Sequence, residues 1–251
     1  VGLCDVLNDL GRVYTQAGRW AETIAVFEQS MAISENIGDV LATARTANNL
    51  AVVLVGRNQL DRAGALYQRA SELFARLGSR LGVAVTKYNR GEVLLYQDRA
   101  AEALELFQAA IADLEAINAR SFLPEVLRLA ALAALAFGDL TQARANAHRS
   151  LAIAEELGQA DDSAIAYRVL GEIALACGDL DVAEDLFARS SSTLAQLDNR
   201  YELGKVRYQQ ARLALARHDD ATAATARAEA ITIFTELDAQ RDLTLAMALP
   251  A

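Results

Sequence analysis

One pattern returns six times in this chain at an interval of 40 residues. Each period closes on an apolar residue, and these positions keep their spacing without a slip: Ile37, Leu77, Ile117, Leu157, Leu197 and Leu237. A small residue lies 26 positions before each of them: Gly11, Ala51, Gly91, Ala131, Gly171 and Ala211. A period between about 20 and 50 residues is typical of a solenoid, in which each unit buries its apolar face by stacking on its neighbours. The period therefore predicts an extended repeat array without a single central core.

Each period reads as two helices joined by a tight turn. In the fourth period, Leu127, Ala131 and Ala134 recur at spacings of three and four residues, as in an amphipathic helix. Gly138 and Asp139 follow, and glycine commonly ends a helix while aspartate caps the start of the next. We therefore expect an all-α fold. The first helices are expected over 3–17, 41–56, 81–97, 122–137, 161–177 and 200–217, each followed by its partner helix.

The 251 residues hold six periods and about a dozen further residues, so the sequence predicts one array over 1–251. The expected repeats are 1–38, 39–78, 79–118, 119–158, 159–198 and 199–238, with a short capping helix in 239–251. Gln210 and Arg227 are polar where most inner repeats are apolar, the exception being Arg90 in the third, and this is typical of a terminal capping repeat.

Composition narrows the class of function. The net charge of −9 argues against nucleic-acid binding by this segment, because phosphate neutralisation supplies most of such affinity. No apolar run reaches the roughly 20 residues that span a bilayer, and no signal-peptide pattern follows Val1. Cys4 and Cys177 lie four periods apart, too far for a disulfide in a stack, so we expect both to be reduced and buried. A cytoplasmic protein is indicated, and the scarcity of lysine beside arginine favours a bacterial source.

The first period carries a family resemblance. Its sequence resembles a tetratricopeptide repeat in the order of its large, small and aromatic residues: Leu10, Gly11, Tyr14, the turn at Gly18, Trp20, Ile24, Phe27 and Ser30. The period of 40 residues in place of 34 is similar to a longer-helix subclass, which includes Pins-like scaffolds, kinesin light chains, bacterial transcription activators and peptide pheromone receptors. The resemblance implies a right-handed α-α superhelix whose first helices line a concave groove that binds a peptide or a protein.

The resemblance also places the groove-facing side chains. In the first three repeats they are mostly amides: Asn8, Arg12, Asn48, Asn49, Tyr88, Asn89 and Glu92. In the last three repeats they are mostly basic: Arg128, Arg168, Lys205, Tyr208 and Arg212. Side-chain amides both donate and accept, so they can pair with a peptide backbone of any sequence. The alternative is that these asparagines satisfy neighbouring helix ends or face solvent.

The basic side chains have two interpretations as well. Arginines at one per repeat can hold a carboxylate or a phosphate in a bidentate manner. Alternatively, they form ion pairs with Glu125 and Glu172 in the adjoining rows. The two-carboxylate clamp of chaperone cofactors needs lysines and asparagines at fixed groove positions, and no register of this chain supplies them.

Catalysis is not expected. His148 and His218 fall at positions that other repeats fill with solvated or turn residues, and Trp20 shares its position with packing leucines. Neither histidine has a second metal ligand at a suitable spacing, and the chain carries no phosphate-binding loop or nucleophile motif. We expect no cofactor and no metal.

Three functions therefore compete. The first is a non-catalytic peptide- or protein-binding scaffold, acting as the sensor or partner-recruiting part of a larger bacterial regulatory protein. The second is a small-molecule or anion sensor in the same groove. The third is self-association, or contact with another domain of the same chain. None of them involves a membrane or direct contact with nucleic acid.

Overall fold

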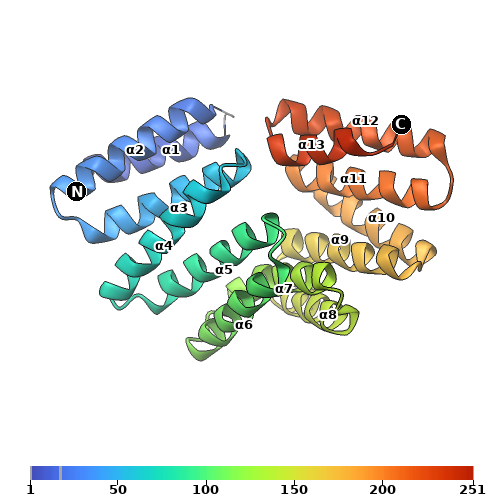
Figure 1. Cartoon of the computed structure of the whole chain (residues 1–251), viewed down its shortest axis with the longest axis horizontal. Coiled ribbons are helices and arrows are strands. Elements are labelled where there is room, and N and C mark those ends of the chain that lie inside the picture. Colours follow the sequence, from blue (N-terminus) through green and yellow to red (C-terminus); the bar gives the residue numbers. More distant parts are fainter. Residues whose placement is uncertain (1, 17–18, 251) are drawn as a thin grey trace. The chain divides into compact units, whose positions relative to one another are not determined.

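The structure is a computed structural model that describes residues 2–16 and 19–250. Over these residues it is all-α, with 13 α-helices, one short 3-10 helix and no strand (Figure 1). The first helices of the six repeats are α1 (Gly2–Gln16), α3 (Val40–Gly56), α5 (Arg80–Tyr96), α7 (Leu123–Phe137), α9 (Ala160–Cys177) and α11 (Arg200–Ala216). Their partners are α2 (Trp20–Asn36), α4 (Leu60–Arg76), α6 (Ala100–Ala116), α8 (Leu140–Glu156), α10 (Leu180–Gln196) and α12 (Asp220–Glu236). The 3-10 helix η1 (Arg120–Phe122) precedes α7, and α13 (Gln240–Ala248) follows α12.

The expected all-α fold of helix pairs is confirmed. Each predicted first helix begins and ends within one residue of the observed one, and α13 is the expected short capping helix. The predicted turn at Gly18 lies outside the described residues. Among those residues, no helix is long and apolar enough to cross a membrane.

The turns repeat as regularly as the helices. From the end of α2 onward, one residue between consecutive helices adopts the left-handed conformation, and it is glycine or a short polar residue at most junctions. The glycines are Gly38, Gly78, Gly138, Gly158 and Gly178, and the other residues with positive φ are Asn58, Asp98, Asn118, Asp198, His218 and Asp238. Side-chain caps then start several helices, with oxygen atoms of Asp39, Ser79, Asp139, Asn199 and Asp219 accepting a backbone N–H.

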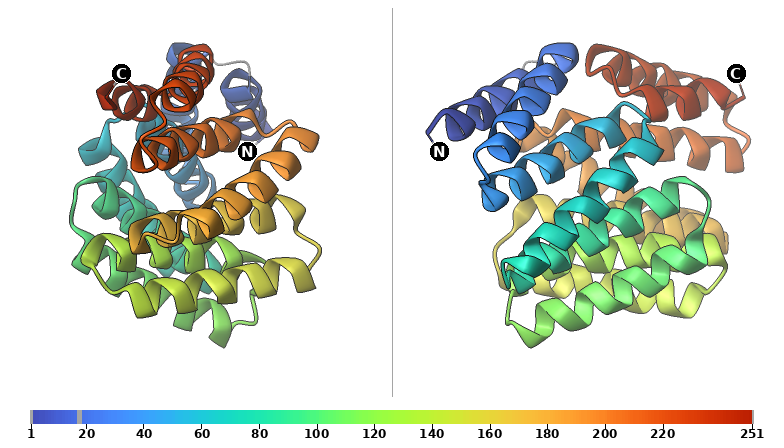
Figure 2. Two further views of the ribbon diagram at one scale, coloured as in Figure 1. Left: turned by 90° about the vertical axis from the view of Figure 1, so that its right-hand side faces the viewer. Right: turned by 60° about the vertical axis from the view of Figure 1, so that its left-hand side comes forward.

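The helices pack into two compact units, one ending at Ala119 and the other beginning at Arg120. In the first unit, each of the helices α1 to α6 packs on the next, and first helices also touch one another, α1 on α3 and α3 on α5. The second unit repeats this plan from α7 to α13, with α9 touching both α7 and α11. Figure 2 shows the stacked antiparallel pairs of each unit. Each unit therefore has one face built from first helices and another built from second helices.

Within a repeat, the second helix packs its aromatic ring onto the small residue of the first. A Cβ atom added at Gly11, Gly91 or Gly171 would lie 2.4, 2.7 or 2.5 Å from a ring carbon of Phe27, Phe107 or Phe187, respectively. All three rings are almost fully buried. The small residue thus sets how closely the two helices of a pair approach.

This contact makes a prediction for stability. Gly91→Ala is expected to lower the free energy of unfolding by about 1–3 kcal/mol, because the new carbon overlaps the ring of Phe107. Gly64→Ala is the matched control, since its new carbon meets Val93 Cγ1 at 3.7 Å, an ordinary contact. That variant should gain about 0.5–1 kcal/mol from the better helix propensity of alanine. Chemical denaturation measures both, and equal stability of the two variants would contradict this packing.

The cysteines agree only partly with expectation. Both are free thiols, and Cys4 is buried as predicted. Cys177 is half-buried at the end of α9, so the expectation of burial is wrong for it. The last residue of a first helix lies beside the turn, where less of the neighbouring repeat covers it.

Candidate functional site

Asn8 is held inside the first unit. Its amide Nδ2 lies 2.9 Å from the Cys4 carbonyl oxygen, 3.0 Å from Ser30 Oγ and 2.8 Å from Thr46 Oγ1. Its Oδ1 accepts hydrogen bonds from Thr46 Oγ1 at 3.2 Å and from Asn49 Nδ2 at 3.5 Å. These contacts tie α1 to α2 and α3. For Asn8 the structure therefore favours the alternative in which asparagine satisfies neighbouring helices.

Asn48 and Asn89 form a different arrangement. Asn89 Nδ2 donates to Asn48 Oδ1 at 3.1 Å, which bridges the first helices of the second and third repeats. The other amide atoms, Asn48 Nδ2 and Asn89 Oδ1, make no hydrogen bond with any residue that the structure describes. One donor on α3 and one acceptor on α5 thus remain beside a hydrogen bond between neighbouring first helices, and Asn89 is 9% exposed. A peptide group carries the matching acceptor and donor. We call these two residues the amide pair.

The remaining candidates of the first unit lie on α1 and α5. Tyr88 is buried, whereas Arg12 is exposed and lies 3.5 Å from Asp9. Glu92 accepts a hydrogen bond from the Tyr96 hydroxyl at 2.7 Å. Val52, one turn beyond Asn48 on α3, exposes 52% of its surface. The face around the amide pair is therefore mixed, with amides, an exposed aliphatic side chain and one carboxylate.

The basic candidates of the second unit lie in a row of ion pairs along α7, α9 and α11. Arg128 Nη1 lies 2.7 Å from Asp162 Oδ1, and Arg168 contacts Glu172 on its own helix and Glu202 on the next first helix, the latter at 3.1 Å. Lys205 lies 3.0 Å from Glu202. We call these six residues the charged row. Its three basic groups are matched by three carboxylates, so it has no net charge.

The charged row is also largely removed from solvent. The side chains of Arg168, Glu172 and Glu202 expose only 6%, 10% and 12% of their surface. Burial alone would raise the pKa of Glu202, but the charges of Lys205, Arg168 and Arg128 outweigh it and lower that pKa to about 2. Burial alone would lower the pKa of Lys205, and the neighbouring Glu202 charge instead raises it. Glu202 and Lys205 therefore each favour the charged form of the other inside the row.

Two further candidates lie at the end of the second unit. Arg212 is exposed and donates to Gln209 Oε1 at 2.9 Å. Tyr208 packs against the apolar cluster of Ala230, Phe234 and Ala246, which joins α12 to α13. Neither residue belongs to the charged row, so the basic positions predicted from the sequence do not form one site.

The sequence analysis missed the acidic partners Asp162 and Glu202. Each follows its arginine by 34 residues, because the start of one first helix lies beside the middle of the preceding one. That repeated offset was the available signal. Glu172 was predicted as a partner and does pair with Arg168.

Other candidates for chemistry behave as packing or surface residues. Trp20 packs against the cluster of Phe27, Leu50 and Tyr67, and its Nε1 has no partner among the described residues. His148 and His218 are exposed. Over the described part of the chain, no group of three or more His, Cys, Asp or Glu residues is placed to hold a metal ion.

Comparison with known proteins identifies the repeat. The sequence model described as tetratricopeptide repeat matches residues 2–76 and again residues 43–116. The chain carries tetratricopeptide repeats. The two matches cover nearly all of the first unit, and the second unit continues the 40-residue period of these tetratricopeptide repeats. No curated protein sequence matches the chain.

Solved structures with similar folds support the same assignment for both units. Aspartyl phosphate phosphatase F from Bacillus subtilis is 15% identical with a TM-score of 0.77, covering 92% of this chain and 59% of its own. The Rap conjugation gene regulator of plasmid pLS20, solved with the Phr* peptide, is 13% identical and has a TM-score of 0.77. The match covers 100% of this chain and 66% of the regulator. A Podospora anserina putative kinesin light chain, described as having nearly identical TPR-like repeats, shares 18% sequence identity with this chain and has a TM-score of 0.61. The match covers 78% of this chain and 96% of the kinesin light chain structure.

At these identities the likeness shows the tetratricopeptide fold alone. The chain spans less than two thirds of the length of the first two of these proteins.

Proposed function

We propose that this chain is a non-catalytic scaffold that binds a peptide or protein segment on the first-helix face of its first unit. The observation that carries the proposal is the amide pair, in which Asn48 Nδ2 and Asn89 Oδ1 are left for an outside partner. A peptide group has one N–H donor and one C=O acceptor, so a single extended residue can satisfy both atoms. Asn49 and the exposed Val52 on α3 and Glu92 on α5 share the helices of the pair, and we propose that they contact side chains of the bound segment.

The relatives in structure support a peptide as the partner. One of them was solved with the Phr* peptide, and another, a Rap protein, with Competence and Sporulation Factor. The first is titled a conjugation gene regulator, which supports a place in a bacterial regulatory protein. We propose that place, in the cytoplasm, for this chain. One relative is named a phosphatase. We propose no catalysis here, because the carboxylates of the charged row are paired with basic side chains and none is poised as an acid or a base.

An anion sensor has less support. Arg128, Arg168 and Lys205 are matched by carboxylates on the same face. An incoming phosphate or carboxylate would have to displace a partially buried ion pair, which costs several kcal/mol. Self-association is the remaining alternative, and the experiment below separates it from peptide binding.

The test uses peptides selected from a random library on the immobilised chain. Their dissociation constants are measured by fluorescence anisotropy for the wild type, for Asn48→Ala/Asn89→Ala and for the control Asn36→Ala on the exposed end of α2. The double variant should bind about 30-fold more weakly, since two hydrogen bonds are lost at about 1 kcal/mol each. Its melting temperature should be nearly unchanged, because both partners of the internal hydrogen bond are removed together and no buried group is left unpaired.

Three results would redirect the proposal. Equal affinity of the double variant and Asn36→Ala would remove the amide pair from the site. A loss on altering Glu28 or Gln68 would place the partner on the second-helix face. If analytical ultracentrifugation shows dimers that Asn48→Ala/Asn89→Ala dissociates, the face serves self-association.

A further inference from the structure

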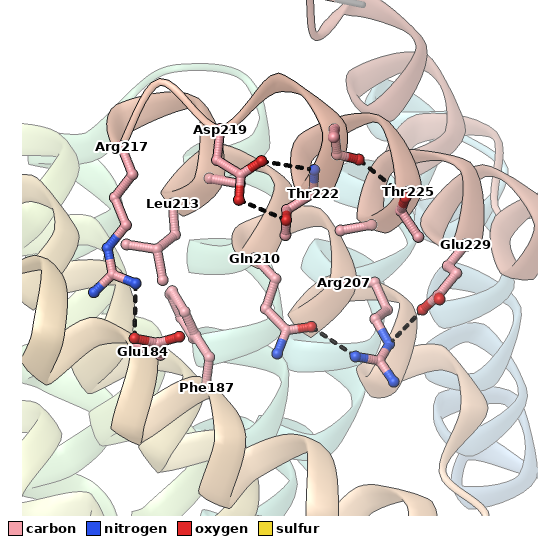
Figure 3. Close-up of a pocket in the computed structure, with 13 residues that line it drawn as sticks. Glu184, Phe187, Arg207, Gln210, Leu213, Arg217, Asp219, Thr222, Thr225 and Glu229 are labelled. Carbon is pink, nitrogen blue, oxygen red and sulfur yellow. Dashed lines mark hydrogen bonds and ion pairs between the residues drawn. The ribbon is translucent and has the colours of Figure 1, made fainter.

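A pocket of about 550 Å³ lies between α10, α11 and α12, away from the first-helix face (Figure 3). Its apolar side is formed by Phe187, Leu213 and Ala226, which expose 0%, 5% and 8% of their surface. Its polar side includes Arg207, Gln210 and Thr225. The volume falls within the range of roughly 300–1,000 Å³ that is usual for ligand sites.

The second and fifth repeats fill the same place with two leucine side chains. Gln210 occupies the position that Leu50 has in the second repeat and Leu170 in the fifth. Ala226 occupies the position of Leu66 and Leu186 in the same two repeats. In the second repeat, Leu50 is 1% exposed, and Leu66 packs against the same apolar cluster. In the sixth repeat both leucines are absent, and the space that they occupy in the second and fifth repeats is open.

A third substitution keeps the pocket open. Arg227 replaces the aromatic residue that the fifth repeat has at Phe187. Its guanidinium turns away to the end of α13, where Nε donates to the Ala246 carbonyl oxygen at 3.0 Å and Nη2 to that of Met247 at 2.8 Å. The sixth repeat therefore has no large side chain of its own that fills the opening.

The walls of the pocket favour a neutral ligand. Arg217 pairs with Glu184 at 2.7 Å, and Arg207 pairs with Glu229 at 2.8 Å. Gln210 Oε1 accepts from Arg207 Nη1 at 2.8 Å, which holds the amide over the pocket. Gln210 Nε2 makes no hydrogen bond with any residue that the structure describes. The site thus offers an apolar surface and one oriented hydrogen-bond donor.

We propose that this pocket is a second binding site, which takes a leucine- or phenylalanine-type side chain of a peptide segment. The side chain occupies the space that leucines fill in earlier repeats, and a backbone carbonyl oxygen of the segment accepts from Gln210 Nε2. This site is separate from the amide pair and does not depend on it.

The test uses N-acetyl-L-leucinamide and N-acetyl-L-phenylalaninamide as probes, with N-acetylglycinamide as the control compound. Methyl resonances of Leu213, Thr225 and Ala226 are followed by NMR in the intact chain. The two apolar probes should give saturable shifts, and the glycine compound none. Ala226→Leu should abolish the shifts and raise the melting temperature by a few degrees, since it restores the residue of the earlier repeats.

Two variants keep the result interpretable. Ala224→Leu adds the same bulk to an exposed position of α12 and should leave the shifts unchanged. Gln210→Leu refills the pocket from α11 and should also abolish them, which provides a second route if Ala226→Leu folds poorly. Shifts that persist in both filled variants, or that N-acetylglycinamide reproduces, would overturn the proposal, as would the absence of saturable shifts in the wild type.

Discussion

Arg168→Ala is expected to lower the free energy of unfolding of the second unit by about 3–5 kcal/mol. Arg168 contacts both Glu172 and Glu202, and all three side chains are about nine-tenths buried or more. Removing the guanidinium takes the shared cation away from Glu172 and Glu202, and Lys205 remains beside Glu202 at 3.0 Å. An unpaired charge in a buried position costs far more than the pair contributes, so the effect is large.

The matched control is Arg144→Ala, which breaks a pair with Asp179 at 3.3 Å whose side chains are about half exposed. This change should leave the free energy of unfolding almost unchanged, since exposed ion pairs are screened by water and salt. Urea denaturation of the two variants and the wild type gives the comparison. Similar midpoints for the two variants would mean that the charged row is solvated and has no special role in stability.

The second large effect is a loss of stability in acid that depends on Glu202. Its pKa is lowered to about 2 from an ordinary value of 4.5 in the presence of Lys205, Arg168 and Arg128. A lowered pKa in the folded state means that the unfolded chain takes up the proton first, so stability is present above about pH 4.5 and is lost as the pH falls towards 2. The expected loss is about 3 kcal/mol over that interval.

Glu202→Gln tests this assignment because it removes the titrating group. The variant should be less stable than the wild type at neutral pH, but its free energy of unfolding should fall less steeply between pH 4.5 and 2. Glu236→Gln, at a half-exposed ion pair on α12, should keep the acid dependence of the wild type. A Glu202→Gln variant with the same acid dependence as the wild type would show that other carboxylates dominate.

The sequence predicted the fold closely because the period leaves little freedom. Six helix pairs of equal length must turn at equal intervals, and residues that tolerate the left-handed conformation, such as Gly138, Gly178 and Asn58, stand at those turns. The apolar and small positions then determine which faces meet, as Gly91 and Phe107 show. Helix bounds were therefore predictable to one residue.

The site was less predictable, because spacing places a side chain on a face without naming its partner. Asn8 and Asn48 occupy equivalent positions, yet Asn8 bonds Ser30 and Thr46 inside the first unit while Asn48 pairs with Asn89. The two surroundings differ in that Ser30 beside Asn8 is replaced by Ala70 in the next repeat, and that the Thr86 hydroxyl donates to the Gly82 carbonyl oxygen. For the basic residues, the offset of 34 residues from Arg168 to Glu202 is the sequence signal that identifies the acidic partner.

Gln210 shows a related limit. Its polar character suggests a solvated cap at the end of the array, and it is in fact one wall of a pocket. The loss of large apolar side chains gives the same sequence pattern in a solvated cap and in a pocket. The packing of α10 and α12 around Gln210 shows that this pattern is a pocket here.

Photo-crosslinking tests the central claim most directly. Benzoylphenylalanine is placed at Val52, one turn from Asn48 on the first-helix face, or at Gln68, an exposed position on α4 of the second-helix face of the same unit. Each protein is irradiated with a peptide selected on the wild-type chain, and adducts are counted by mass spectrometry. The account predicts an adduct at Val52 and none at Gln68. An adduct at Gln68 with none at Val52 would contradict it, because the partner would then lie on the second helices.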